Sequence, residues 1–291
     1  MRFGFCVPNY GVKIRPDDMV ESAILAESAG FDSVWATDHI IVPTKFTHPY
    51  GDLVEPFVIL SYIAAKTESV RLGSSILVIP QRNPIIVAKQ AAALDRLSRG
   101  RMILGAGVGW LEEEFRYLNA DFKRRGKFLD ESIHLMRALW QDDLVSFAGK
   151  FFRVRNAVFF PKPAKSIPIW IGGDSASAIR RASRLGDGWH PVGTPPPQIE
   201  RGVKTIRKGG RKVTISLRIS VDMKGGRPSY RSASGEKRVG LTGSRQDIVR
   251  MIEDYVSAGV EHFVVFINSP NSERLFADMK KFSSDILRSF K

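Results

Sequence analysis

The chain alternates short apolar runs with longer amphipathic stretches along its whole length, and this alternation limits the fold more than any other feature. Eight runs have the composition of buried parallel strands: Phe3–Pro8, Ser33–Thr37, Arg71–Ile79, Met102–Val108, Pro168–Gly172, Gly188–Val192, Val213–Val221 and His262–Ile267. A stretch of helical periodicity follows each run, over residues 17–29, 56–68, 84–98, 126–140, 175–185, 196–208, 244–258 and 271–289. Eight such units predict a (β/α)8 TIM barrel, a single domain over residues 1–291.

The main alternative is a doubly wound sheet, which places a glycine-rich phosphate loop after its first strand. Here the first strand leads to Pro8-Asn9-Tyr10-Gly11, without that fingerprint, so the barrel is favoured. Two insertions interrupt the repeat. Residues 143–160 predict a β-hairpin, and residues 222–243, rich in Gly, Ser, Lys and Arg, predict a mobile loop after the seventh strand.

Positive charge is concentrated in one part of the chain. The sequence has 44 Lys and Arg residues against 30 Asp and Glu, and residues 201–250 hold 14 of the basic residues and three acidic ones. Such a segment attracts anions, so a phosphorylated or polycarboxylate ligand and a solvated surface both stay open. Because no helix-turn-helix, zinc-finger or aromatic–basic RNA motif is present, we expect no nucleic-acid partner.

Composition also bears on location and metal binding. No apolar run reaches the ~20 residues of a membrane helix, and Met1-Arg2 leads into the first strand without a signal-peptide pattern. The single cysteine, Cys6, excludes an internal disulfide, and the five histidines show no i, i+4 spacing. We therefore expect a cytoplasmic protein with no membrane contact and no metal site.

In a TIM barrel the loops at the carboxyl ends of the strands carry the function. Asp38 and His39 directly follow the second strand. An Asp beside a His can orient the ring and set its protonation, which makes a proton donor or shuttle. A histidine that only caps the loop is the alternative, and the position at the barrel opening favours the functional interpretation.

Glycine and small residues mark two further places along the strands. Gly73-Ser74-Ser75 within the third strand indicates a bulge or the close approach of a ligand, and Gly105–Trp110 indicates a tight exit beside a flat ligand. The next helix begins with three glutamates, Glu112, Glu113 and Glu114. Two interpretations stay open: one of these side chains faces the site, or all three are solvated.

The fifth strand supplies the sharpest local motif. It runs through Ile171 into Gly172-Gly173-Asp174-Ser175 and then a helix. The first N–H groups of a helix point out of its positive end, which suits a phosphate, and Ser175 can cap the helix or contact that phosphate. A simple glycine turn is the alternative.

Together these motifs resemble the bacterial-luciferase-like superfamily of flavin- and deazaflavin-dependent oxidoreductases. The resemblance covers nearly the whole chain and is carried by Arg2–Pro8, AGFDSVWATDH at 29–39, RLGSSILVIPQRNPIIVAKQAAALDRLSRGR at 71–101, LGAGVGWLEEEF at 104–115 and PIWIGGDSASAIRRASRLGDGW at 168–189. Within the superfamily the chain looks most like the branch that uses the deazaflavin coenzyme F420.

The resemblance implies roles for particular residues. His39 would be the catalytic donor or acid at the reacting edge of the coenzyme, and Asp38 would contact the ring system. Ser75-Ile76 would form a bulge with a non-prolyl cis peptide behind the ring. The remaining implied contacts are Val78, Val108 and Gly109 along the ring or its side chain, and Gly172, Gly173, Ser175 and Ala176 around the phosphate.

The chain departs from the sugar-phosphate branch of this superfamily, which carries a glutamate where Trp110 stands and a tryptophan where Pro43 stands. The expected function is hydride transfer between the deazaflavin C5 and a small-molecule substrate. An FMN-dependent monooxygenase or reductase and a non-catalytic flavin-binding barrel are the alternatives. A homodimer stays open.

Overall fold

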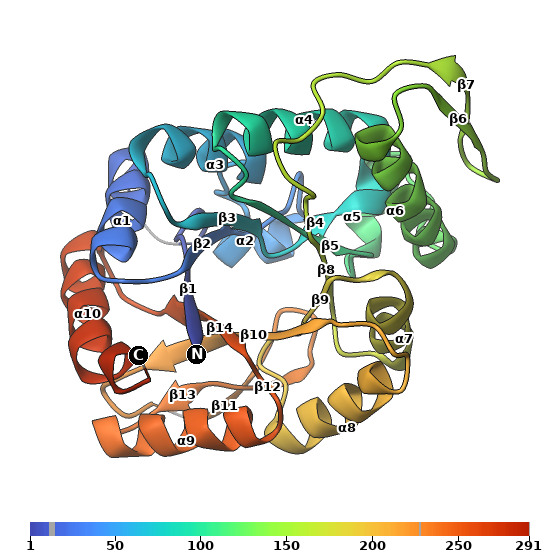
Figure 1. Cartoon of the computed structure of the whole chain (residues 1–291). Helices are drawn as coiled ribbons and strands as arrows, with labels where there is room; N and C mark the ends of the chain where they lie inside the picture. Colours follow the sequence, from blue (N-terminus) through green and yellow to red (C-terminus); the bar gives the residue numbers. More distant parts are fainter. Residues whose placement is uncertain (12–14, 227, 291) are drawn as a thin grey trace.

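The computed structural model describes residues 1–11, 15–226 and 228–290, and its centre is a closed parallel barrel (Figure 1). The barrel strands are β1 (Arg2–Cys6), β2 (Ser33–Ala36), β3 (Arg71–Ser74), β4 (Leu77–Val78), β5 (Met102–Gly107), β8 (Ile169–Gly172), β9 (Gly188–His190), β10 (Thr214–Asp222) and β14 (His262–Ile267). They follow the order β10-β14-β1-β2-β3-β5-β8-β9, β4 pairs with β5, and a β9–β10 pairing closes the ring. The predicted TIM barrel is confirmed.

Helices surround the barrel on the outside (Figure 1). The helices of the eight units are α1 (Pro16–Ser28), α3 (Pro56–Lys66), α4 (Pro84–Leu97), α6 (Arg125–Gln141), α7 (Ala176–Leu185), α8 (Pro196–Arg207), α9 (Arg245–Ser257) and α10 (Ser272–Asp285). Further short elements are α2 (Thr47–Tyr50) and α5 (Glu112–Tyr117), with 3-10 turns η1 (Thr44–Phe46), η2 (Ile79–Gln81) and η3 (Leu287–Ser289). None of the helices in the described part of the chain is long and apolar enough to cross a membrane.

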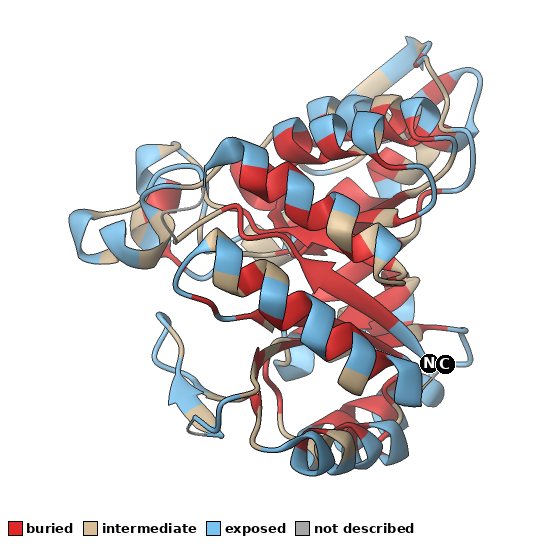
Figure 2. Cartoon of the chain, turned by 90° about the vertical axis from the view of Figure 1, so that its left-hand side faces the viewer, coloured by how far each residue is buried: buried red, intermediate tan, exposed pale blue. Residues whose placement is uncertain are grey.

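The apolar core has two parts. The larger part lies between the barrel and the helices, whose outer faces are exposed (Figure 2). The smaller part fills the barrel interior with Cys6, Trp35, Ile103, Trp170 and Val264. The rings of Trp35 and Trp170 lie 5.0 Å apart, so large aromatic side chains fill the barrel as a packed core.

The third predicted strand is interrupted, as its small residues indicate. The run over residues 71–79 divides into β3 and β4, and a non-prolyl cis peptide joins Ser75 to Ile76 between them. The need for a glycine at position 73 in β3 comes from core packing and not from the predicted approach of a ligand. A Cβ atom there would lie 2.2 Å from the Trp35 ring, so the glycine makes room for the barrel core.

Both insertions contain antiparallel hairpins. Strands β6 (Val145–Ala148) and β7 (Arg153–Ala157) project beyond the helices (Figure 1), as predicted. The segment predicted as a loop over residues 222–243 contains short strands, with β11 (Ser229–Arg231) paired to β12 (Lys237–Val239) and β13 (Leu241–Thr242) paired to β10. A turn closed by the Gly235 N–H on the Ser232 carbonyl makes the hairpin possible, with Gly235 at φ +82°. Arg227 of this insertion lies outside the described residues.

Candidate active site

Asp38 follows β2 at the carboxyl end of the barrel and is buried. Its carboxylate accepts two hydrogen bonds from Arg82, at 2.8 and 2.7 Å, and one from the Val78 N–H at 2.9 Å. The Asp38 side chain is fully buried and that of Arg82 is 14% exposed. Asp38 therefore fixes β4 and the following turn, and its predicted contact with a coenzyme ring stays a prediction.

His39 lies beside a buried carboxylate that comes from the start of α5. The Nδ1 atom of His39 is 3.0 Å from Oε2 of Glu114, and the other Glu114 oxygen accepts the N–H groups of Ile40 and Ile41 at 2.6 and 3.2 Å. Burial by itself would raise the pKa of Glu114, but the hydrogen bonds from His39 and Ile40 outweigh it and hold this pKa below its usual value. Glu114 is therefore an ionised acceptor.

An ionised carboxylate has no proton to donate, so the Nδ1 atom of His39 carries the shared proton. This leaves Nε2 of His39 as the atom that can take up or release a proton. Of the three glutamates considered from the sequence, Glu114 is the one that faces the candidate site. Its neighbour Glu113 pairs instead with Lys45 at the surface.

Aromatic rings lie around His39. Its ring centroid is 4.4 Å from that of Tyr50 and 5.9 Å from that of Trp110, and the Phe46 ring lies 5.2 Å from Trp110. Tyr50 in turn lies 5.4 Å from Tyr10. An apolar surrounding of this kind limits the access of water to the His39–Glu114 pair.

The Ser75–Ile76 bulge packs against glycines of the neighbouring strands. A Cβ on Gly107 would lie 1.7 Å from Cδ1 of Ile76, and one on Gly172 would lie 2.7 Å from Cγ2 of Ile76. A Cβ on Gly105 would lie 1.9 Å from the Ser74 carbonyl oxygen. In this structure the glycines of β5 therefore accommodate the bulge, where the sequence predicts the approach of a flat ligand.

Gly109 connects the bulge to the next loop. It has φ +77°, and a Cβ there would lie 2.7 Å from Val78 and 2.8 Å from Phe115. Val108 and Gly109 are partly exposed, whereas Val78 is buried. The structure thus brings Val78 and Gly109 together, and their contact with a coenzyme stays a prediction.

The glycine-rich segment after β8 leads into α7. Gly173 has φ +97°, which favours glycine, and Ser175 caps the helix by accepting the Ala178 N–H at 3.2 Å. Gly172 is buried, and Gly173, Ser175 and Ala176 are exposed. Because the first N–H groups of a helix lack intrahelical acceptors, this end of α7 can receive an anion.

The hairpin of the second insertion reaches this segment. Arg238 of β12 donates to Asp174 at 2.6 Å and to the Val192 carbonyl at 2.7 Å, and Thr194 donates to Asp174 at 3.1 Å. Arg238 also pairs with Glu236. The Asp174 carboxylate would oppose an anion at the start of α7, so its pairing with Arg238 removes that obstacle.

A buried polar network below the bulge was not anticipated from the sequence. Nε2 of His190 is 2.9 Å from Oγ of Ser75 and Nδ1 is 2.8 Å from Oγ of Ser216, while Arg218 donates to the Ser75 carbonyl and the Tyr10 hydroxyl, both at 2.8 Å. The signal in the sequence is a lone arginine within the apolar run Val213–Val221.

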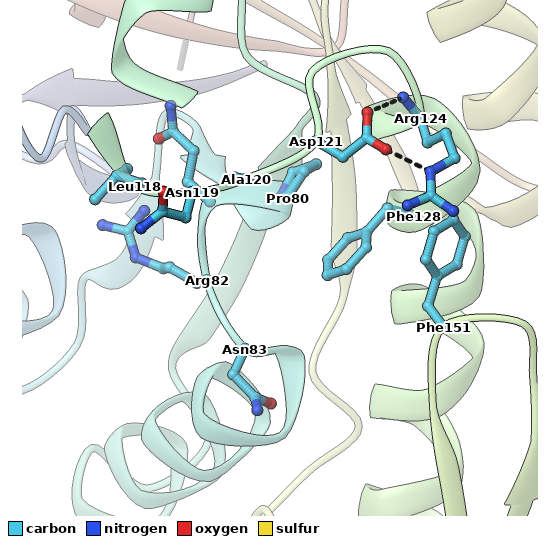
Figure 3. A pocket seen from close by; sticks show the side chains of 11 residues that line it. Pro80, Arg82, Asn83, Leu118, Asn119, Ala120, Asp121, Arg124, Phe128 and Phe151 are labelled. Atoms are coloured by element: carbon cyan, nitrogen blue, oxygen red, sulfur yellow. Dashed lines mark hydrogen bonds and ion pairs between the residues drawn. The ribbon is translucent and has the colours of Figure 1, made fainter. Parts of the chain in front are cut away.

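A cavity of about 350 Å³ lies beside the turn that follows β4 (Figure 3). Arg82 and Asn119 line one side, and Phe128, Phe151 and Arg124 line the other. The cavity shares Arg82 with the support of Asp38 but does not include His39. Because the His39–Glu114 pair lies outside this cavity, we assign the candidate site to the barrel opening around that pair.

The structure places the His39–Glu114 pair and the exposed start of α7 at the carboxyl end of a TIM barrel, where barrel enzymes carry their active sites. The family model described as luciferase-like monooxygenase matches residues 1–224, and the chain belongs to this family.

The chain is also similar to particular proteins in sequence and in fold. The chain is 33% identical over 196 residues to an uncharacterized protein of Mycobacterium tuberculosis, covering 63% of this chain and 68% of the relative. It is 27% identical over 318 residues to the F420-dependent glucose-6-phosphate dehydrogenase of Amycolatopsis mediterranei, covering 94% of each. The structure of an F420-dependent secondary alcohol dehydrogenase with an F420–acetone adduct shares the fold, with a TM-score of 0.83, 21% identity and 98% coverage of both chains.

Proposed function

We propose that this protein is an F420-dependent oxidoreductase that transfers a hydride between the deazaflavin C5 and a small organic substrate. The observation that carries the proposal is the His39–Glu114 pair at the barrel opening. It is supported by one relative in sequence, matched over 94% of both chains, that is an F420-dependent dehydrogenase. When bound, the deazaflavin supplies two-electron hydride chemistry.

The residues present fit this coenzyme. A phosphate suits the start of α7, where Gly172, Gly173, Ser175 and Ala176 lie and where Asp174 is neutralised by Arg238. The ring system suits the neighbouring Ser75–Ile76 bulge, and the residues proposed to contact it are Asp38, Ser75, Ile76, Val78, Val108 and Gly109.

The chain's own contribution to the reaction is the control of one proton. Hydride transfer to a carbonyl leaves an oxygen that needs a proton, and the reverse reaction releases one. We assign this proton to Nε2 of His39, because Glu114 holds the other ring nitrogen in its protonated form. The His39 side chain is 7% exposed and lies against the rings of Tyr50 and Trp110, which limits the exchange of this proton with water.

An FMN-dependent monooxygenase is the second candidate, favoured by the description of the matching family as luciferase-like monooxygenase. FMN ends at its phosphate, whereas F420 continues into a tail with several carboxylates. The exposed side chains of Lys224 and Arg231 in the second insertion favour the coenzyme with the longer anionic tail.

The first experiment titrates the purified protein separately with F420 and with FMN and follows each chromophore by absorbance and fluorescence. We expect tight binding of F420 and weak binding of FMN. Tight FMN binding without F420 binding would replace the proposal by its second candidate, and the absence of binding by both would refute it.

The second experiment tests the proton assignment. Reduced F420 is mixed with a panel of small ketones, and oxidised F420 with the corresponding alcohols and with sugar phosphates. For any pair that reacts, we expect His39→Ala and Glu114→Gln to lower turnover by about 10²–10⁴-fold with a much smaller effect on coenzyme affinity. His134→Ala, at an exposed position on α6, is the matched control and should leave both unchanged.

A further inference from the structure

Arg218 is a buried positive charge with neutral partners. It lies on β10, is 8% exposed, and takes part in none of the ion pairs among the described residues. Its hydrogen bonds go to the Ser75 carbonyl and the Tyr10 hydroxyl. A guanidinium remains protonated in proteins, so this charge is present at all ordinary pH values.

The titratable neighbours do not neutralise this charge. Burial raises the pKa of Tyr10 to about 12, although Arg218 acts in the opposite direction, so the phenol stays protonated. Burial, together with the charge of Arg218, lowers the pKa of His190 to about 3, so this imidazole is neutral. A buried charge without a counter-ion destabilises the fold, so its presence at this position requires either a ligand that pairs with it or a structural role.

The charge lies at one end of a row of aromatic rings whose other end is His39. The Arg218 guanidinium is 5.9 Å from the ring centroids of both Tyr10 and Phe266. Tyr10 stacks on Phe266 at 5.8 Å and lies 5.4 Å from Tyr50, which is 4.4 Å from His39. Tyr10, Tyr50 and Phe266 are each partly exposed, so the row borders the barrel opening.

We propose that Arg218 is a binding residue for an anionic oxygen of a ligand in the barrel opening, a carboxylate or an enolate-like oxygen. The inference deepens the proposed function and rests on it in placing the ligand over the row of rings that runs from Arg218 to His39. Arginine suits this task because its planar fork binds a carboxylate through two parallel hydrogen bonds.

Two sources could supply that oxygen. One is a substrate that carries a carboxylate, which Arg218 would hold while His39 serves the reacting carbonyl or alcohol. The other is the coenzyme itself, because a reduced deazaflavin carries more negative charge on its ring than the oxidised form, and a nearby positive charge would favour the reduced form. Both sources share the chemistry of a delocalised oxyanion.

The experiment compares the wild type with Arg218→Met, which keeps an apolar stem, and Arg218→Gln, which keeps hydrogen-bonding capacity without charge. Arg211→Met is the matched control, since Arg211 is exposed beside β10 and pairs with Asp187. Urea unfolding establishes which variants fold, and Arg218→Gln is used if Arg218→Met does not.

The first arm needs no coenzyme. The thermal midpoint is measured with acetate, propionate and benzoate, and with acetamide, propionamide and benzamide as neutral counterparts. A substrate carboxylate is supported if a carboxylate stabilises the wild type and its amide does not. The affinity for that carboxylate should then be at least tenfold weaker in the Arg218 variant and unchanged in the Arg211 control. The second arm measures dissociation constants for oxidised and reduced F420. An at least tenfold rise in the ratio of reduced to oxidised constants in the Arg218 variant supports the coenzyme as the source.

The proposal is overturned if carboxylates and amides act alike on the wild type and the ratio of the two coenzyme constants is unchanged by the substitution. Arg218 would then serve only to hold the Ser75 carbonyl. Failure of the proposed function has a different signature, which is the absence of F420 binding by the wild type. In that case the carboxylate arm alone decides whether Arg218 binds an anion.

Discussion

The buried pair of Asp38 and Arg82 gives the sharpest prediction about stability. In Arg82→Met the Asp38 carboxylate keeps only the Val78 N–H as a partner while it remains fully buried. Removing one member of a buried ion pair costs about 3–5 kcal/mol, and the 0% exposure of the Asp38 side chain places this site within that range. Asp38→Asn should cost less, about 1–3 kcal/mol, because Arg82 is 14% exposed and has Glu55 at 3.7 Å.

The double variant tests whether the two losses share one cause. When both charges are gone, neither is left buried alone, so the double variant should lose less stability than the two single losses together, by about 0.5–3 kcal/mol. The assay is urea unfolding of the four proteins at one pH. Lys45→Met, which removes an exposed charge from the Glu113 pair, is the control and should change stability by about 0–1 kcal/mol. A cost below about 1 kcal/mol for Arg82→Met, or losses that simply add, would refute this reasoning.

Three further predictions concern pH, packing and charge. Burial and the charge of Arg218 lower the pKa of His190 in the folded protein to about 3. The unfolded chain therefore binds a proton at His190 more readily than the folded protein does, so the free energy of unfolding should fall as the pH drops from about 6.5 toward 3. Urea midpoints between pH 4 and 7 should show this slope, up to about 1.4 kcal/mol per pH unit, reduced in His190→Gln. Gly107→Ala should destabilise by about 1–3 kcal/mol because its Cβ meets Ile76, and Ile76→Ala should restore much of the loss in the double variant. Neutralising Lys224 and Arg231 should weaken F420 binding modestly and FMN binding much less. The dissociation constant for F420 should also depend less on salt in this variant than in the wild type.

Each of these has a control or a contrary result. An unchanged pH slope in His190→Gln would mean that other groups govern acid stability. Gly105→Ala should not be rescued by Ile76→Ala, because its Cβ meets the Ser74 backbone. Neutralising the exposed Lys280 on α10 should leave F420 affinity unchanged. If the Lys224 and Arg231 variant binds F420 as tightly as wild type at low salt, this basic segment is only a solvated surface.

The barrel was predictable because each of its strands is a near-continuous apolar run bounded by turn residues. The interrupted third strand was also predictable from Ser74-Ser75. The reason for Gly73 was not, because the Trp35 ring that excludes a side chain there comes from another strand. Local sequence carries no record of such contacts across the barrel.

In the candidate site too, features set by local sequence could be predicted and features set by contacts between distant segments could not. Asp38 and His39 were found from their place after a strand. The choice of Glu114 over its two neighbours depends on which helix face turns toward His39, and this is set only when α5 packs. Arg218 was missed because a single basic residue among many did not stand out, although its position inside an apolar strand was a usable signal.

The pairing of β1 with β14 has a consequence for how the chain acquires its fold. Arg2 lies opposite His262 and Phe5 opposite Val265, so the ring cannot close until the last strand has left the ribosome. Until then β1 and β10 each present an unpaired edge, and such edges template association between chains. Because contacts of such long sequence separation slow folding, we expect the nascent chain to depend on holding chaperones until β14 inserts between β10 and β1.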